Sequence, residues 1–157
     1  VAFYHSHENV ILLDGQANEQ FLYRALRGAH LALWEADYTL QFVEPRFLGE
    51  TTADYRVILL PFVMHLPETH AESLREFVQQ GGTVIGFAKL GHVNERGWAW
   101  NNRPGAGLTS LFGATETHIE VFREPHEKIT LQVDQLFRAI GQQLGFHAAG
   151  VGSNSFW

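Results

Sequence analysis

The first chemically suggestive stretch is GGTVIGFAKLGH, residues 81–92, which is typical of a helix end, a buried strand and a sharp turn. Many α/β hydrolytic folds hold a nucleophile at such a turn, and here the turn offers Lys89. A lysine amine attacks a carbonyl only when burial or a neighbouring cation lowers its pKa by several units. The residues favour the more ordinary interpretation, a lysine that pairs or packs along a loop.

Histidines follow several of the expected strands, and the chain has 9 of them. Four of these histidines and one glutamate form a possible set of metal ligands: His5, His7, His65, His92 and Glu95. Imidazole and carboxylate groups bind divalent metals, and a catalytic zinc needs three protein ligands and an open position. Because His-x-His is a weak signal by itself, we expect loop histidines, no metal site and no cofactor. A metal-dependent hydrolase that uses these ligands is the alternative.

A second candidate contact region lies within residues 98–105. It combines flat apolar faces with hydrogen-bonding groups: Trp98, Trp100, Asn101, Asn102 and Arg103. Such a set suits a protein interface, a sugar-stacking platform, or simple packing over the end of the sheet. Because Trp and Arg are enriched at interface hot spots, the composition favours the interface.

The elements that position these residues alternate between strands and helices. Apolar runs predict strands at residues 1–4, 38–42, 57–60 and 83–87, and the second of these is expected near a sheet edge because Pro45 follows it. Helical spacing predicts helices over residues 18–35, from Pro67 to a left-handed cap at Gly81, and briefly over 108–112. Residues 5–8 are expected to form a loop, as is the long stretch 88–107.

This order of elements predicts right-handed crossovers and a mostly parallel sheet with helices on both faces. We expect a flavodoxin-like, three-layer α/β/α sandwich. The loops after the first, third and fourth strands then converge at the crevice where such folds place their sites. Farther along, residues 119–121 and 129–133 predict strands, and residues 134–145 predict a helix before a glycine- and serine-bearing tail.

The composition excludes several classes of protein. A formal charge of −6 argues against nucleic-acid binding, which needs a basic face. No apolar run approaches the roughly 20 residues of a membrane span, so no membrane partner is expected. The absence of cysteine excludes disulfides and cysteine nucleophiles. The compartment stays open, with the cytoplasm slightly favoured. Since the chain begins at Val1 with an apolar run, we expect a fragment of a longer protein.

Three ordered segments carry a family resemblance: VAFYHSHENVILLDG at residues 1–15, LREFVQQGGTVIGFAKLG at 74–91, and NERGWAWNNRPGAGLTSLFG at 94–113. They resemble the middle, trimerisation domain of family forty-two β-galactosidases, which is similar in fold to class I glutamine amidotransferases. The resemblance covers residues 1–122. We interpret residues 123–157 as a C-terminal elaboration of the same domain and a tail.

The resemblance implies a role as well as a fold. In such enzymes a separate β/α barrel carries the catalytic carboxylates, and the middle domain assembles a trimer. The implied partners are therefore the parent barrel and further copies of the same chain, with carbohydrate contact as a possibility. Lys89 falls where amidotransferases carry their cysteine, so it marks a degenerate nucleophile elbow and no catalytic residue is expected here. A carbohydrate-binding module is a further alternative.

Overall fold

The computed structural model describes residues 1–48 and 54–118. The strands β1 (Ala2–Tyr4), β2 (Gln41–Val43), β3 (Val57–Leu60) and β4 (Thr83–Gly86) form one sheet. All pairings are parallel and the order is β2-β1-β3-β4, which confirms the expected flavodoxin-like arrangement and the edge position of β2. The strands predicted at 119–121 and 129–133, the helix at 134–145 and the segment 123–157 as a whole lie outside the described residues.

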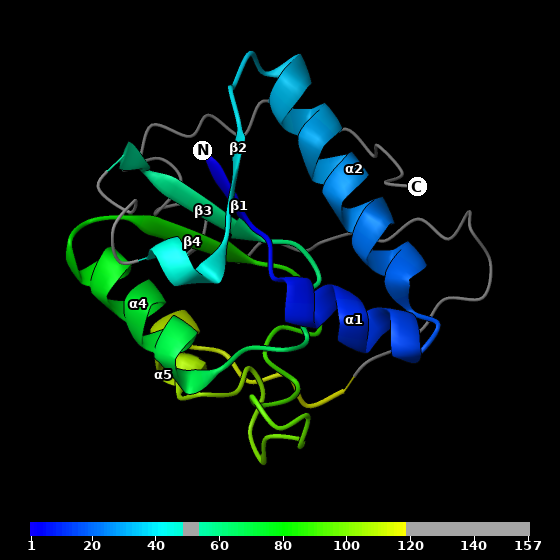
Figure 1. Ribbon diagram of the computed structural model, residues 1–157. Coiled ribbons are helices and arrows are strands. Elements are labelled where there is room, and N and C mark those ends of the chain that lie inside the picture. Colours follow the sequence, from blue (N-terminus) through cyan, green and yellow to red (C-terminus); the bar gives the residue numbers. More distant parts are fainter. Residues whose placement is uncertain (49–53, 119–157) are drawn as a thin grey trace. The chain divides into compact units, whose positions relative to one another are not determined.

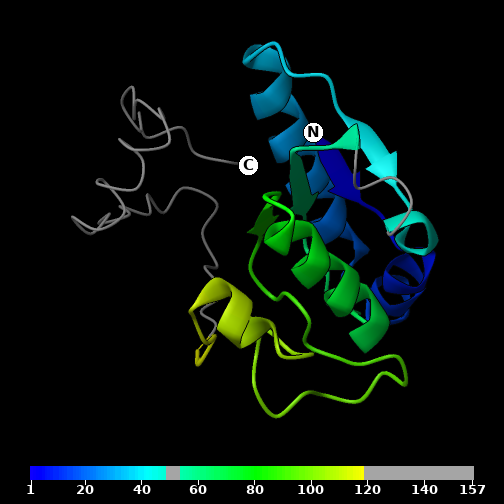
Figure 2. The same ribbon diagram turned by 90° about the vertical axis from the view of Figure 1, so that its left-hand side faces the viewer.

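Helices cover both faces of the sheet, which gives three layers (Figure 1). On one face α2 (Glu19–Glu35) packs on the two central strands, where Ala29 meets Phe3 and Leu59. On the other face lie α4 (Glu68–Gln79) and the short α5 (Leu108–Phe112). Figure 2 shows the same layers from the side. None of the helices in the described ranges combines the length and apolarity that spanning a bilayer requires.

The larger core cluster lies between the sheet and α4. Ile58 and Leu60 of β3 and Leu74 of α4 are fully buried there, because alternate residues of a strand point to the same face. The helix α4 ends as expected, with Gly81 in a left-handed conformation at φ 92°. The short helix α5 likewise ends at Gly113, whose φ is 61°.

One expectation was wrong: residues 5–8 do not form a loop throughout. The helix α1 (His7–Gly15) begins two residues after His5, and a 3-10 turn, η1 (Pro45–Phe47), follows β2. Ser6 starts α1, since its hydroxyl oxygen accepts a hydrogen bond from the backbone N–H of Asn9 at 3.2 Å. His7 is therefore a helical residue.

Candidate functional site

The candidate site lies at the carboxyl ends of β1 and β3, where the strand order reverses. Buried Asn9, in the first turn of α1, is hydrogen-bonded through its side chain to the loop that leaves β3. Its Oδ1 accepts from the backbone N–H of His65 at 2.9 Å, and its Nδ2 donates to the carbonyl of Phe62 at 3.2 Å. Because both ends of the amide are used, the start of α1 is fixed against the loop after β3.

Titratable side chains surround a recess at this edge. It has a volume of about 460 Å³ and is lined by His5, His7, Glu8, Glu44, Pro45, Arg46 and His70. The hydroxyl of Tyr4 and Nδ1 of His70 are 2.9 Å apart, and Ser6 donates to Glu8 at 2.8 Å. Burial lowers the pKa of His70, whereas hydrogen bonds from its own backbone N–H and from Ser6 lower the pKa of Glu8.

The predicted metal ligands lie in different surroundings. His65 is buried, and its Nδ1 has no hydrogen-bond partner among the described residues. His92 Nε2 lies 2.8 Å from a carboxylate oxygen of Glu116, and Glu95 is exposed. Within residues 1–48 and 54–118, no three His, Asp or Glu side chains are arranged to hold a metal ion.

The elbow after β4 has the sharp geometry that the sequence predicts. Lys89 has a φ of 63°, in the left-handed region, and its backbone N–H donates to Glu116 at 3.3 Å. Its Nζ lies 5.5 Å from the ring centroid of Phe62 and 6.0 Å from that of Phe21, and these two rings stack on each other. The amine therefore interacts with two aromatic faces.

The long loop after the elbow is organised by a small hairpin. Val93 pairs antiparallel with Ala99, and Asn94 Oδ1 accepts from the backbone N–H groups of Arg96 and Trp98, both at 3.0 Å. The Trp98 side chain is 66% exposed, and the Arg96 guanidinium lies 5.8 Å from its ring centroid. The hairpin thus presents an indole and a cation together at its tip.

The other members of the predicted contact region have different environments. Trp100 is half-buried and packs against the larger core cluster, whereas Asn101 and Asn102 are exposed. The carbonyl of Arg103 accepts from the backbone N–H of Glu116 at 2.7 Å. The structure therefore divides the two tryptophans between the surface and the interior.

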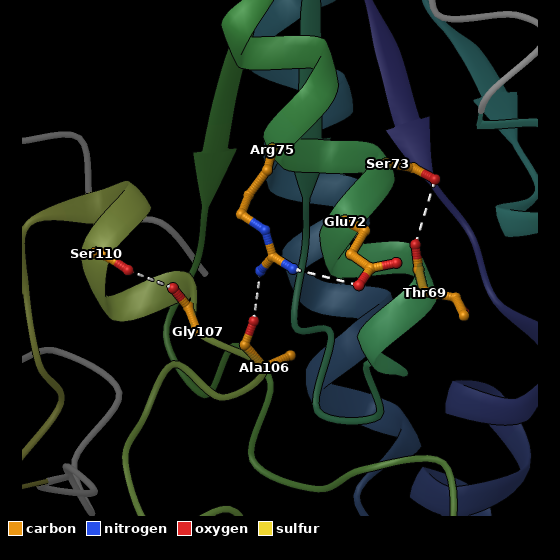
Figure 3. Close-up of polar contacts among 7 residues, drawn as sticks. All are labelled: Thr69, Glu72, Ser73, Arg75, Ala106, Gly107 and Ser110. Carbon is orange, nitrogen blue, oxygen red and sulfur yellow. Dashed lines mark hydrogen bonds and ion pairs between the residues drawn. The ribbon is translucent and has the colours of Figure 1, made fainter.

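A guanidinium fastens the end of this loop to α4 (Figure 3). Arg75 Nη1 donates to the carbonyl of Ala106 at 2.6 Å, while Nη2 lies 4.0 Å from Glu72. Next to it, the hydroxyl of Ser110 donates to the carbonyl of Gly107 at 2.7 Å. Sequence reasoning missed Arg75, Asn9 and Glu116, because each acts through a partner distant in sequence.

The fold and the site define a class: a parallel α/β domain whose elbow holds a lysine in contact with aromatic rings. Comparison with protein families matches residues 1–142 to the beta-galactosidase trimerisation domain, and the chain belongs to this family. The match continues past Phe122, to which the sequence analysis traced the resemblance.

A solved structure has the same fold. It is a beta-galactosidase from Bifidobacterium adolescentis, which matches with a TM-score of 0.66 and 23% sequence identity over 76% of this chain. The match takes in 57% of that chain, so the present chain spans little more than half of its length. No curated protein sequence matched.

Proposed function

We propose that this chain is a non-catalytic assembly domain of a β-galactosidase-like glycoside hydrolase, which joins copies of the enzyme into a trimer. The catalytic barrel belongs to another part of the parent protein. The observation that carries the proposal is the match of residues 1–142 to the trimerisation domain family.

The elbow supports this assignment. A nucleophilic lysine needs an environment that favours its neutral form. Here Nζ lies near the faces of Phe21 and Phe62 and packs against these two rings. Lys89 is thus a degenerate nucleophile-elbow position with a structural role.

The experiment is a measurement of mass in solution. Sedimentation equilibrium of the chain and of its parent enzyme is expected to give trimers, and for the chain this is three times its 17.7 kDa. Monomers of both proteins at every concentration would overturn the proposal. The parent enzyme is included because contacts from its barrel add to the interface.

A second candidate function is carbohydrate contact at the hairpin tip, favoured by the exposure of Trp98 beside Arg96. Indole faces stack on sugar rings, and a guanidinium donates to hydroxyl groups. Calorimetry and tryptophan fluorescence with galactosides test it. Binding that disappears in Trp98→Ala supports a sugar contact, whereas no heat and no fluorescence change count against it.

A further inference from the structure

An exposed aromatic recess lies at the C-terminal end of α2. It has a volume of about 290 Å³ and is lined by His30, Trp34, Asp37, Tyr38, Thr39 and Leu40. Trp34 is 71% exposed and Tyr38 is 57% exposed, and the ring of His30 stacks on that of Trp34. Large aromatic side chains left open in this way are typical of interaction sites.

The lining of the recess includes one carboxylate, Asp37, and the N-terminal ammonium of Val1 donates to the carbonyl of Thr39 at 3.4 Å. The last turn of α2 contains Glu35 and no basic residue, and Asp37 follows the C-cap residue Ala36. The carbonyl end of a helix carries a partial negative charge, which a cation would stabilise. Among the described residues no cation forms an ion pair with Asp37.

The backbone conformation of Asp37 is also unfavourable. Its φ is 58°, a left-handed conformation that glycine usually takes after a helix. The backbone N–H of Asp37 bonds the carbonyl of Trp34, and that of Tyr38 bonds Leu33, so the turn itself is well formed. An acidic residue at this position is therefore unfavourable for the isolated helix in both conformation and charge, which points to a use outside the helix.

The hairpin tip of residues 94–98 carries one cation, Arg96, that can pair with Asp37, and one acid, Glu95, beside it. It carries the guanidinium of Arg96 beside the exposed indole of Trp98, and the side chain of Asn94 holds both backbone positions in place. A guanidinium binds carboxylates by hydrogen bonds and stacks on aromatic rings. The recess offers both kinds of partner within one site.

The tip and the recess lie at opposite ends of the sheet (Figures 1 and 2). The recess precedes β2, at the amino edge of the parallel strands, whereas the hairpin follows β4, at the carboxyl edge. One molecule therefore cannot fill its own recess. Two different surfaces that fit each other form a head-to-tail contact, which closes into a ring when the rotation between copies allows it.

We propose that the Arg96–Trp98 hairpin of one copy docks into the Trp34–Asp37–Tyr38 recess of the next, with Arg96 paired to Asp37. The inference rests on the proposed trimer and identifies the surfaces that make it. Each copy contributes one tip and one recess, so a three-membered ring leaves neither unfilled.

Cysteine cross-linking tests this contact directly, because the chain has no cysteine of its own. Thr39→Cys, in the recess, and Glu95→Cys, in the hairpin tip, are made separately, mixed and oxidised, so that Asp37 and Arg96 both stay in place. We expect a disulfide-linked dimer that contains one chain of each variant, in a yield well above that of either variant alone. Glu76→Cys mixed with Glu95→Cys is the matched control, since Glu76 is an exposed acid on α4, across the sheet from α2. Equal yields in both mixtures would overturn the proposal.

Charge exchange provides the second arm. Asp37→Arg and Arg96→Asp should each raise the dissociation constant of the oligomer by ~10-fold or more, and the double variant should recover most of the loss. If the wild-type chain is a trimer and neither substitution weakens it, the docking inference is wrong but the proposed assembly role is still supported. Monomeric wild-type chain and monomeric parent enzyme overturn both. A recess covered by residues 119–157 of its own chain gives no mixed dimer and also overturns the inference.

Discussion

Gly105→Ala is the sharpest test of how the long loop is built. Gly105 is buried, and a Cβ at this position would overlap the indole of Trp100, with Nε1 only 2.6 Å away. The backbone cannot withdraw freely, because the N–H of Gly105 donates to the carbonyl of Gly91 at 2.9 Å. The indole must therefore leave its place against the core cluster.

Overpacking of a well-packed site costs ~1–3 kcal/mol. Because the whole indole must move, we expect a loss of ~2–3 kcal/mol in the free energy of unfolding. For a chain of 157 residues this corresponds to a melting temperature lower by roughly 4–12 °C. Urea denaturation followed by tryptophan fluorescence measures the loss and reports the new environment of Trp100.

Two further variants isolate the cause. Gly15→Ala is the control, since a Cβ there meets nothing within 4 Å, and alanine at the end of α1 should leave stability equal or slightly higher. In a Trp100→Leu background the Gly105→Ala penalty should shrink by ~1 kcal/mol or more, because the overlapping ring is gone. The reasoning would be refuted if the stability losses of Gly105→Ala and Trp100→Leu simply added. It would also be refuted if Gly105→Ala alone had the urea midpoint of the wild type.

Three other outcomes follow from the same structure. Leu74→Ala empties a fully buried position and should cost ~2–5 kcal/mol in urea denaturation; a cost below ~1 kcal/mol would contradict its place in the core. Burial lowers the pKa of His70 from 6.5, so the unfolded chain binds more protons. The free energy of unfolding should then fall as pH drops below about 6.5, and it should fall less steeply in His70→Gln. The same pH dependence in both proteins would contradict this expectation. At concentrations that keep the chain monomeric, Asp37→Gly should raise the melting temperature by about 1–3 °C, since strain and helix-end repulsion are both removed. A melting temperature below that of the wild type would contradict this expectation.

The central strands could be predicted from the sequence because burial on both faces leaves a simple pattern. β3 coincides with the aliphatic run Val57–Leu60, and Pro61 follows it directly. The helix α2 was equally clear, since its apolar residues recur at helical spacing beside charged ones. The alternation of these elements then determined the parallel order.

The helix α1 could not be recognised in the same way. Residues 10–13 are four consecutive aliphatic residues with no helical period, so the pattern does not separate one face from another. In the structure Leu13 is fully buried while Ile11 is 60% exposed, a contrast that depends on the packing of α1 against α2. Ser6 as an N-cap was the one local signal.

The candidate site was predicted only in outline. Topology brings the loops after β1, β3 and β4 to one edge of the sheet, as the sequence indicates. It does not determine what each imidazole contacts. His92 pairs with Glu116, which lies 24 positions farther along the chain, and His70 pairs with Tyr4 across 66. Residues this far apart in the sequence form no local spacing pattern from which their contact could be predicted.

The elbow connects these observations to the proposed role. A non-glycine residue in the left-handed region costs of order 1 kcal/mol and persists only where its surroundings hold it. At Lys89 the hydrogen bond to Glu116 and the aromatic pair below the amine provide that support. Gly86 lacks a side chain where Leu90 and Phe112 approach, so the chain can turn sharply after β4. The turn sends residues 88–107 across the carboxyl edge of the sheet, and with them the hairpin that carries Arg96 and Trp98. Under the proposed role, this strained turn serves to position the hairpin.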